Sequence, residues 1–99
     1  MYTKTESFRW DRRKAHTNAV KHGIRFEEAA LAFDDPYALV LDALEHSTHE
    51  IRQWLIGDSG FDVLVVVFTP RPPGFGVRII SARRAGRREK RGYEESKRV

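Results

Sequence analysis

The arginines near the C-terminal end are the residues whose type and spacing best suit chemistry. Positions 78 to 88 include Arg78, Arg83, Arg84, Arg87 and Arg88. Arg83 and Arg84 come just after a predicted strand, and we expect them to point to opposite faces because successive side chains alternate along a strand. A rigidly held guanidinium beside a sheet suits a phosphate that gains negative charge during a reaction. These residues indicate binding of RNA or DNA more than they indicate its cleavage.

A second group with chemical potential is the segment Glu45-His46-Ser47-Thr48-His49-Glu50. Zinc binding would need three or four converging ligands. A connection between strands supplies too few of them, so we expect no metal site and no cofactor. As acid and base groups these residues fit better, because histidine titrates near neutral pH and a nearby glutamate can orient it. A solvated loop is the alternative that the sequence leaves open.

The charge distribution points to a polyanionic partner. The chain has 18 Lys and Arg residues against 14 acids, for a net charge of +4. Residues 78–99 hold nine basic residues and three acids, a net charge of +6, which leaves −2 for residues 1–77. Thirteen of the cations are arginine, which can form two parallel hydrogen bonds to phosphate and can stack on bases. Nucleic acid is the most common partner of such a segment, and a basic face kept for solubility is the alternative.

The length of 99 residues allows one domain with one modest core. The chain has no cysteine, which excludes disulfides, thiolate nucleophiles and thiolate metal sites. The longest apolar run, at 63–68, is far shorter than the ~18 residues that span a bilayer. The first residues lack the apolar core of a signal peptide. We therefore expect a cytoplasmic protein with no membrane partner.

Two helices are predicted in the first third of the chain. Asp11 is a suitable N-cap for a helix over 12–22, and Gly23 is a suitable residue to end it. The second helix has one apolar stripe, formed by Phe26, Ala29, Ala30 and Phe33. The sequence Asp34-Asp35-Pro36 ends this helix, because the residue before proline disfavours the α region.

Strands account for most of the remaining chain. A short strand is predicted at 8–10, and others at 38–44, 50–56, 63–69 and 77–82, with a hairpin turn at 57–60 and a proline-rich loop at 70–76. The run 63–69 is apolar on both faces, which places it in the middle of the sheet. A basic C-terminal helix is predicted within 86–99. The order β-α-α-β-β-β-β-α favours an α+β fold, with a small, mostly antiparallel sheet and helices packed on one face.

Taken together, these segments resemble the BrnT toxins of bacterial type II toxin–antitoxin pairs. The resemblance runs from about Phe8 to Glu95 and depends on many short motifs in order: Phe8-Arg9-Trp10-Asp11, Asn18-x-x-Lys21-His22-Gly23, Phe26-Glu27-Glu28-Ala29, Phe33-Asp34-Asp35-Pro36, Glu50-x-Arg52, Ile56-Gly57, Val65-Val66-Val67 and Arg78-Ile79-Ile80-Ser81-Ala82-Arg83-Arg84-Ala85. Residues 1–7 are an extension before it, and the proline-rich loop is longer than the usual tight turn. The resemblance implies that residues 1–99 form a single BrnT-like toxin domain with a RelE-like fold.

The resemblance also implies an activity and a partner. A toxin of this kind cleaves RNA and is neutralised by a BrnA antitoxin that binds DNA, so that the pair represses its own promoter. The absence of cysteines fits a metal-independent endoribonuclease, in which the 2′-hydroxyl of the RNA attacks the adjacent phosphorus. Such a reaction needs a base for the hydroxyl, a cation for the equatorial oxygens and an acid for the leaving oxygen.

For these roles we expect Arg83 to contact the reacting phosphate, Arg52 to support it, and Glu50 or His46 to act as the base. RNA binding is expected from a further set of arginines, Arg71, Arg78, Arg84, Arg87 and Arg88. A non-catalytic RNA- or ribosome-binding module that uses the same basic face is the alternative. The sequence leaves both open, because an arginine that positions a phosphate and one that stabilises its reaction look alike.

Overall fold

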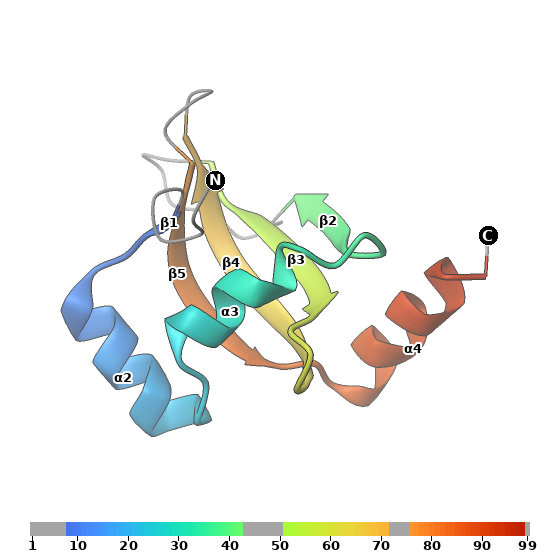
Figure 1. Cartoon of the computed structure of the whole chain (residues 1–99), viewed down its shortest axis with the longest axis horizontal. Helices are drawn as coiled ribbons and strands as arrows, with labels where there is room; N and C mark the ends of the chain where they lie inside the picture. The colour runs from blue at the N-terminus through green and yellow to red at the C-terminus, as the bar shows by residue number, and fades with distance from the viewer. Residues whose placement is uncertain (1–7, 43–50, 72–75, 99) are drawn as a thin grey trace.

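A computed structural model of the chain describes residues 8–42, 51–71 and 76–98. These residues form a five-stranded sheet in the order β1-β5-β4-β3-β2, together with three helices (Figure 1). Along the chain the elements are β1 (Phe8–Arg9), α2 (Arg12–His22), α3 (Phe26–Ala32), β2 (Leu39–Asp42), β3 (Gln53–Asp58), β4 (Val63–Pro70), β5 (Val77–Arg84) and α4 (Arg87–Ser96). This order confirms the predicted succession of elements and the α+β class.

The sheet is antiparallel from β5 through β4 and β3 to β2. Only β1 departs from this pattern, because Phe8 lies beside Val77 and Arg9 beside Arg78 in a parallel pair. Parallel neighbours need a long connection, and most of the chain separates these two strands. The sheet is therefore mixed, and it is mostly antiparallel as predicted.

Helix α2 begins and ends at the residues that local signals predict. The side chain of Asp11 accepts hydrogen bonds from the backbone N–H groups of Arg13 at 2.8 Å and Lys14 at 3.1 Å. These bonds satisfy two of the donors that a helix start leaves free. Gly23 ends the helix with φ of 71° and donates its N–H to Ala19. That left-handed conformation favours glycine.

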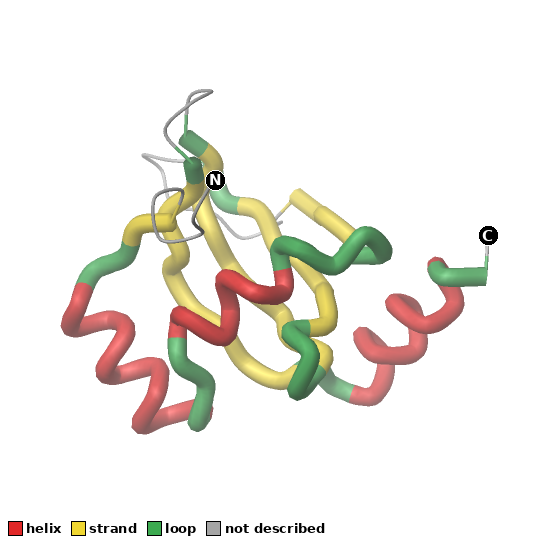
Figure 2. Tube along the Cα trace, viewed as in Figure 1, coloured by secondary structure: helices red, strands yellow, loops and turns green. Residues whose placement is uncertain are grey.

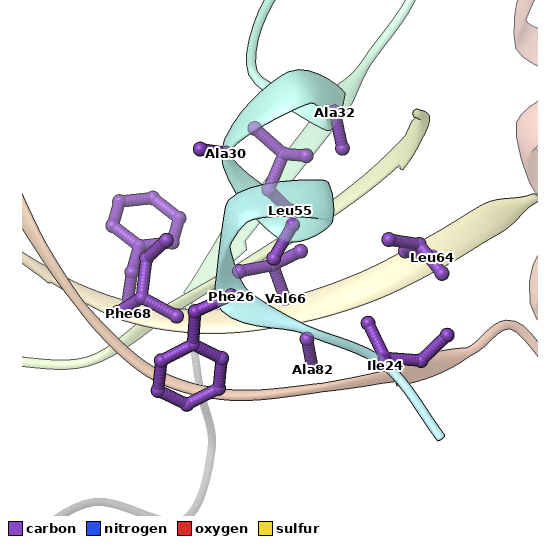
Figure 3. Close-up of a cluster of buried hydrophobic side chains, with 11 residues drawn as sticks. Ile24, Phe26, Ala30, Ala32, Leu55, Leu64, Val66, Phe68 and Ala82 are labelled. Carbon is purple, nitrogen blue, oxygen red and sulfur yellow. The ribbon is translucent and has the colours of Figure 1, made fainter. Parts of the chain in front are cut away.

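The main core lies between one face of the sheet and the helices α2 and α3. Figure 3 shows its side chains between α3 and the strands. Phe26, Ala29 and Ala30 of the predicted apolar stripe are buried in it. Phe33 stacks edge to face on Phe68, with ring centroids 5.0 Å apart. The sheet contributes Leu55, Leu64, Val66, Phe68, Ile79 and Ala82. Burial of each larger side chain stabilises the fold by about 1.5–3 kcal/mol.

The α+β class holds, but the predicted packing of the last helix, α4, is wrong. Tyr93 of α4 is fully buried and packs with Ile56 and Val65 in a second, smaller cluster. Neighbouring side chains along β4, such as Val65 and Val66, point to opposite faces, so α4 packs on the face that α2 and α3 do not cover. The expectation that the helices share one face holds only for α2 and α3. Helices α2 and α4 accordingly lie at opposite sides of the molecule (Figure 2).

The predicted hairpin turn at 57–60 starts too early. β3 continues through Gly57 to Asp58, and the connection to β4 lies at 59–62. A Cβ atom at Gly57 would come within 2.7 Å of the backbone oxygen of Ala32. The glycine therefore allows the end of α3 to lie directly against β3, and it does not mark a turn. The predicted loop at 70–76 and last strand at 77–82 also shift, since Pro70 ends β4 and β5 extends to Arg84.

Candidate functional site

Arg83 and Arg84 lie on opposite faces of the sheet, as predicted. In the ladder between β4 and β5, Arg83 lies beside Val65 and Arg84 beside Leu64. Side chains directly opposite each other in an antiparallel pair share a face. Arg83 is thus on the face covered by α4, which we call the α4 face, and Arg84 is on the face of the main core.

The guanidinium of Arg83 is held by Glu89 of α4. Nη1 donates to Oε1 and Nη2 donates to Oε2, each at 2.7 Å, in a two-pronged ion pair. Nη1 also donates to the backbone oxygen of Arg84 at 3.3 Å. In the part of the chain that the structure describes, neither Nε nor the second hydrogen of Nη2 has a hydrogen-bond or ion-pair partner. The side chain of Arg83 is 39% exposed, so part of it is open to solvent and to an anion.

The electrostatics of this pair favour full ionisation of both groups. The hydrogen bonds that Arg83 donates to Glu89 raise the pKa of Arg83, although partial burial opposes the shift. The hydrogen bonds from Arg83 and from the Gly86 N–H hold the pKa of Glu89 below its ordinary value, again against burial. The Gly86 bond, at 2.7 Å, also caps the first turn of α4. Glu89 therefore joins the end of β5 to the start of α4.

Arg84 has different neighbours on the other face. Its Nη1 donates to the backbone oxygen of His22 at 3.2 Å, and its Nε lies 3.5 Å from a carboxylate oxygen of Asp62. These contacts join β5 to the end of α2 and to the turn before β4. Arg84 therefore connects β5 to α2 and to the 59–62 turn, whereas Arg83 connects β5 to α4.

Three of the other predicted arginines lie near the opposite end of the strands from Arg83: Arg52, Arg71 and Arg78. Arg78 is beside Thr69 in the ladder, and the Thr69 hydroxyl donates to the backbone oxygen of Ile51, next to Arg52. Arg71 follows β4 at the same end, with its N–H bonded to Gly76. Arg78 lies five positions before Arg83 along β5, or roughly 16 Å of strand. The structure therefore forms two groups of cations and does not gather Arg52 against Arg83.

The remaining predicted site residues divide into two sets. Arg87 and Arg88 are exposed in the first turn of α4, close in sequence to the Arg83–Glu89 pair. Both candidate bases, His46 and Glu50, lie outside the described residues.

The α4 face also carries Trp54 and Ser81, since both lie beside Val67 in their ladders. Both side chains are partly accessible.

Sequence reasoning missed Glu89, which is the closest partner of the predicted catalytic arginine. The available signal was the spacing Gly86-x-x-Glu89 at the start of a predicted helix, where a glutamate at the third helical position caps the helix start. Its contact with Arg83 depends on the angle between β5 and α4, which no local pattern specifies.

A basic groove beside α2 was also missed. It has a volume of about 290 Å³ and is lined by Arg13, Lys14, Thr17, Asn18, Lys21, His22, Ile80 and Ser81. Helix α2 contains four Lys and Arg residues and no acid. The net charge of residues 1–77 is −2 and gives no sign of these basic residues. The net charge of the predicted helix at 12–22 alone would have indicated them.

A third constellation joins α4 to the turn after α3. The Tyr93 hydroxyl donates to Oδ2 of Asp35, and the same oxygen accepts from the Asp58 N–H at 2.8 Å. Lys97 lies over the Tyr93 ring, with its Nζ 4.7 Å from the centroid. Burial opposes ionisation of Asp35, but its hydrogen bonds hold its pKa below the ordinary value. Burial and the Asp35 charge raise the pKa of Tyr93.

Two negative findings apply to the described residues alone. Within residues 8–42, 51–71 and 76–98, no three His, Cys, Asp or Glu side chains gather as metal ligands would. In the same ranges, none of the helices has the length and apolar character needed to cross a membrane.

Comparison with known proteins gives one match. The model of a family described as "Ribonuclease toxin, BrnT, of type II toxin-antitoxin system" matches residues 10–89. A search of curated proteins finds no match. The matched range runs from the residue after β1 to Glu89, and it includes Arg52, Arg78, Arg83 and Arg84.

Proposed function

Because this chain belongs to the BrnT family of ribonuclease toxins from type II toxin–antitoxin systems, we propose that it is a metal-independent endoribonuclease in which Arg83 stabilises the reacting phosphate. The family supports an RNA target and an antitoxin partner. The metal independence and the roles of individual residues are our proposal. The observation that carries it is the geometry of Arg83, a partly exposed guanidinium held rigidly at the end of a strand.

The proposed reaction is an internal transfer at phosphorus. The 2′-oxygen of the RNA forms a bond to the adjacent phosphorus, and its proton passes to a base. The bond from phosphorus to the 5′-oxygen breaks, and that oxygen takes a proton from an acid. The products are a 2′,3′-cyclic phosphate and a free 5′-hydroxyl. Negative charge accumulates on the equatorial phosphate oxygens after the 2′-oxygen attacks and before the 5′-oxygen leaves. A preorganised cation beside these oxygens lowers the barrier to the reaction.

Arg83 is suited to this role because part of its guanidinium is already fixed. Glu89 holds the Nη1–Nη2 end, which leaves Nε–H and the second Nη2–H to form two parallel bonds to phosphate oxygens. A group that is oriented before the reaction need not reorganise during it. We retain His46 and Glu50 as candidates for the base and Arg52 as a supporting cation.

The other cations suit binding of the RNA strand on either side of the reacting phosphate. Arg87 and Arg88 lie at the start of α4, near Arg83. Arg78 lies roughly 16 Å from Arg83 along β5, and Arg71 follows β4 at the same end as Arg78. These two arginines would therefore contact a different part of the RNA. Arg84 shares the basic segment, although its contacts with His22 and Asp62 leave less of it for RNA. Trp54 on the α4 face offers a ring on which a base can stack.

We propose a BrnA-like antitoxin as the neutralising partner, in a complex that binds promoter DNA. This part rests on the resemblance and on the family match. Expression of the chain alone should arrest growth, and co-expression with the small open reading frame next to it should relieve the arrest. Normal growth with abundant soluble protein that leaves RNA intact would contradict a toxin.

The experiment that tests the activity is incubation of the purified chain with single-stranded RNA in excess EDTA. We expect cleavage at the same rate with and without EDTA, and fragments that end in 2′,3′-cyclic phosphate. Loss of cleavage in EDTA with recovery on adding Mg²⁺ would contradict the metal-independent mechanism. RNA that is bound but stays uncut under both conditions would favour the non-catalytic binding module.

A further inference from the structure

Glu89 makes three short hydrogen bonds that converge on one carboxylate. Two come from the guanidinium of Arg83 and one from the N–H of Gly86, all at 2.7 Å. Its side chain is 25% exposed. The pair spans two elements that are joined by only a short connection, β5 and α4, so that the carboxylate connects the end of the strand to the first turn of the helix.

We propose that Glu89 is the positioning residue of the nuclease site. It fixes the rotamer of Arg83 so that the Nε–H and Nη2–H edge is presented to the scissile phosphate. This inference rests on the proposed function, since it assigns a partner to the arginine that acts on the phosphate. A long side chain such as arginine loses rotamer entropy when it is ordered, and this loss opposes the ordering. The ion pair orders it before RNA binds.

The contacts of Glu89 favour positioning over proton transfer. Oε1 already accepts two hydrogen bonds and Oε2 accepts one. The hydrogen bond from Arg83 lowers the pKa of Glu89, which makes the carboxylate a weaker base than an ordinary glutamate. A carboxylate in this state holds a cation well and is poorly suited to take a proton from a hydroxyl.

Helix α4 has a second attachment that does not involve Glu89. Tyr93 is buried against Ile56 and Val65 and donates to Asp35. We therefore expect α4 to stay in place when Glu89 is changed, and the effect of such a change to appear in Arg83. This separation makes the positioning role testable.

The test is a double-mutant cycle on single-turnover cleavage of a labelled single-stranded RNA by the full chain, with RNA affinity measured in parallel. Glu89→Gln should slow cleavage by about 10- to 100-fold, the scale of loss that a misplaced catalytic group produces, while the Kd for RNA changes less than about threefold. In an Arg83→Ala background the same change should cost less than about twofold more, because the residue that Glu89 positions is already absent.

Two further variants separate positioning from helix capping. Gly86→Pro removes the backbone donor to Glu89 and keeps the Arg83 pair, and the φ of −75° at Gly86 suits proline. It should cleave RNA at close to the wild-type rate. Glu89→Asp keeps the charge at the helix start but is one methylene too short to hold both Nη atoms, so it should be slow like Glu89→Gln.

The outcomes distinguish this inference from the proposed function. If Arg83→Ala cleaves at the wild-type rate, the proposed function fails. If Arg83→Ala is slow and both Glu89 variants are as fast as wild type, the positioning role is overturned and the proposed function stands. The positioning role would also be overturned if Gly86→Pro slowed cleavage as much as Glu89→Gln does. The same holds if the effects of Glu89→Gln and Arg83→Ala on the cleavage rate were additive in the double mutant. Either result would assign Glu89 to helix capping.

Discussion

Asn18 of α2 satisfies both backbone polar groups of Ala82, a residue 64 positions later in β5. Its Nδ2 donates to the Ala82 oxygen at 2.8 Å, and its Oδ1 accepts from the Ala82 N–H at 3.0 Å. The same Nδ2 donates to the oxygen of Ile24 at 2.9 Å. One buried amide therefore joins α2 and the connection between α2 and α3 to the strand that carries Arg83.

We expect Asn18→Ala to lower the free energy of unfolding by about 3 kcal/mol. The substitution leaves buried backbone groups without partners, and each such group costs about 1–3 kcal/mol. Urea unfolding at neutral pH measures the change. Thr17→Ala, at the neighbouring exposed position, is the matched control and should change stability by less than about 0.5 kcal/mol. Equal effects of the two substitutions would mean that the Asn18 bonds do not contribute.

Tyr93→Phe tests the attachment of α4 to the rest of the fold. The ring can still pack against Ile56 and Val65, but the hydroxyl that donates to Asp35 is lost. A hydrogen bond to a charged group contributes about 1.5–3 kcal/mol, and thermal or urea unfolding should show a loss of that size. Tyr37→Phe, on a half-exposed tyrosine, serves as the control. A Tyr93→Phe variant as stable as wild type would contradict the role assigned to this bond.

The same cluster predicts how stability depends on pH. The pKa of Asp35 is lower in the folded state than its ordinary value of 3.8. As the pH falls, the unfolded state therefore binds the proton first. The stabilisation from Asp35 is complete above the ordinary value and is lost as the pH falls through the folded pKa. Glu89, whose pKa is also lowered, adds to this trend.

The urea midpoint of unfolding should therefore fall less between pH 6 and pH 3 in Asp35→Asn than in wild type. The variant is less stable at pH 6, because the carboxylate that accepts from Tyr93 and Asp58 is gone, and it loses less on acidification. Glu95→Gln, an exposed change on α4, should follow the wild-type profile. If the urea midpoint fell as much between pH 6 and pH 3 in Asp35→Asn as in wild type, the role assigned to Asp35 would be contradicted.

The parts of the fold that local signals specify could be predicted from the sequence. The bounds of α2 follow from Asp11 and Gly23, both of which act on backbone groups within one turn. Gly57 shows where this reasoning stops. A glycine near a strand end is typical of a turn, but here it gives room for the backbone of Ala32, a residue distant in sequence.

The candidate site divides in the same way. The alternation of side chains along a strand correctly placed Arg83 and Arg84 on opposite faces. The pairing of Arg83 with Glu89 was not predicted, because it depends on where α4 lies after it leaves β5. The separation of Arg52 and Arg78 from Arg83 depends on the register of three strands, which composition and spacing do not reveal. The roles of His46 and Glu50 stay predictions.

The salt dependence of RNA binding tests the contribution of the helix start. Each phosphate contact on single-stranded nucleic acid adds about 0.7 to the slope of log K against log salt concentration. If Arg87 and Arg88 each contact a phosphate, replacing both by alanine should lower the slope by roughly 1.4 without abolishing cleavage. Fluorescence anisotropy over a salt series measures the slope.

The matched control for this pair is the replacement of Arg12 and Arg25, which are exposed at the start of α2 and just before α3. That double variant removes the same charge from another part of the surface and should leave the slope unchanged. If replacing Arg12 and Arg25 lowered the slope and replacing Arg87 and Arg88 did not, the RNA would instead lie on the face of the main core.

The account depends most on Arg83, and comparison of two alanine variants tests it directly. Single-turnover cleavage of single-stranded RNA should be about 10²–10³-fold slower in Arg83→Ala, the usual loss for one preorganised donor to a developing oxyanion. RNA affinity should change little, and Arg83→Lys should recover only part of the rate because a point charge cannot replace the planar fork. Arg84→Ala, which removes the same charge from the opposite face, should cleave at close to the wild-type rate. Wild-type cleavage by Arg83→Ala together with slow cleavage by Arg84→Ala would contradict the account and place the reaction on the other face of the sheet.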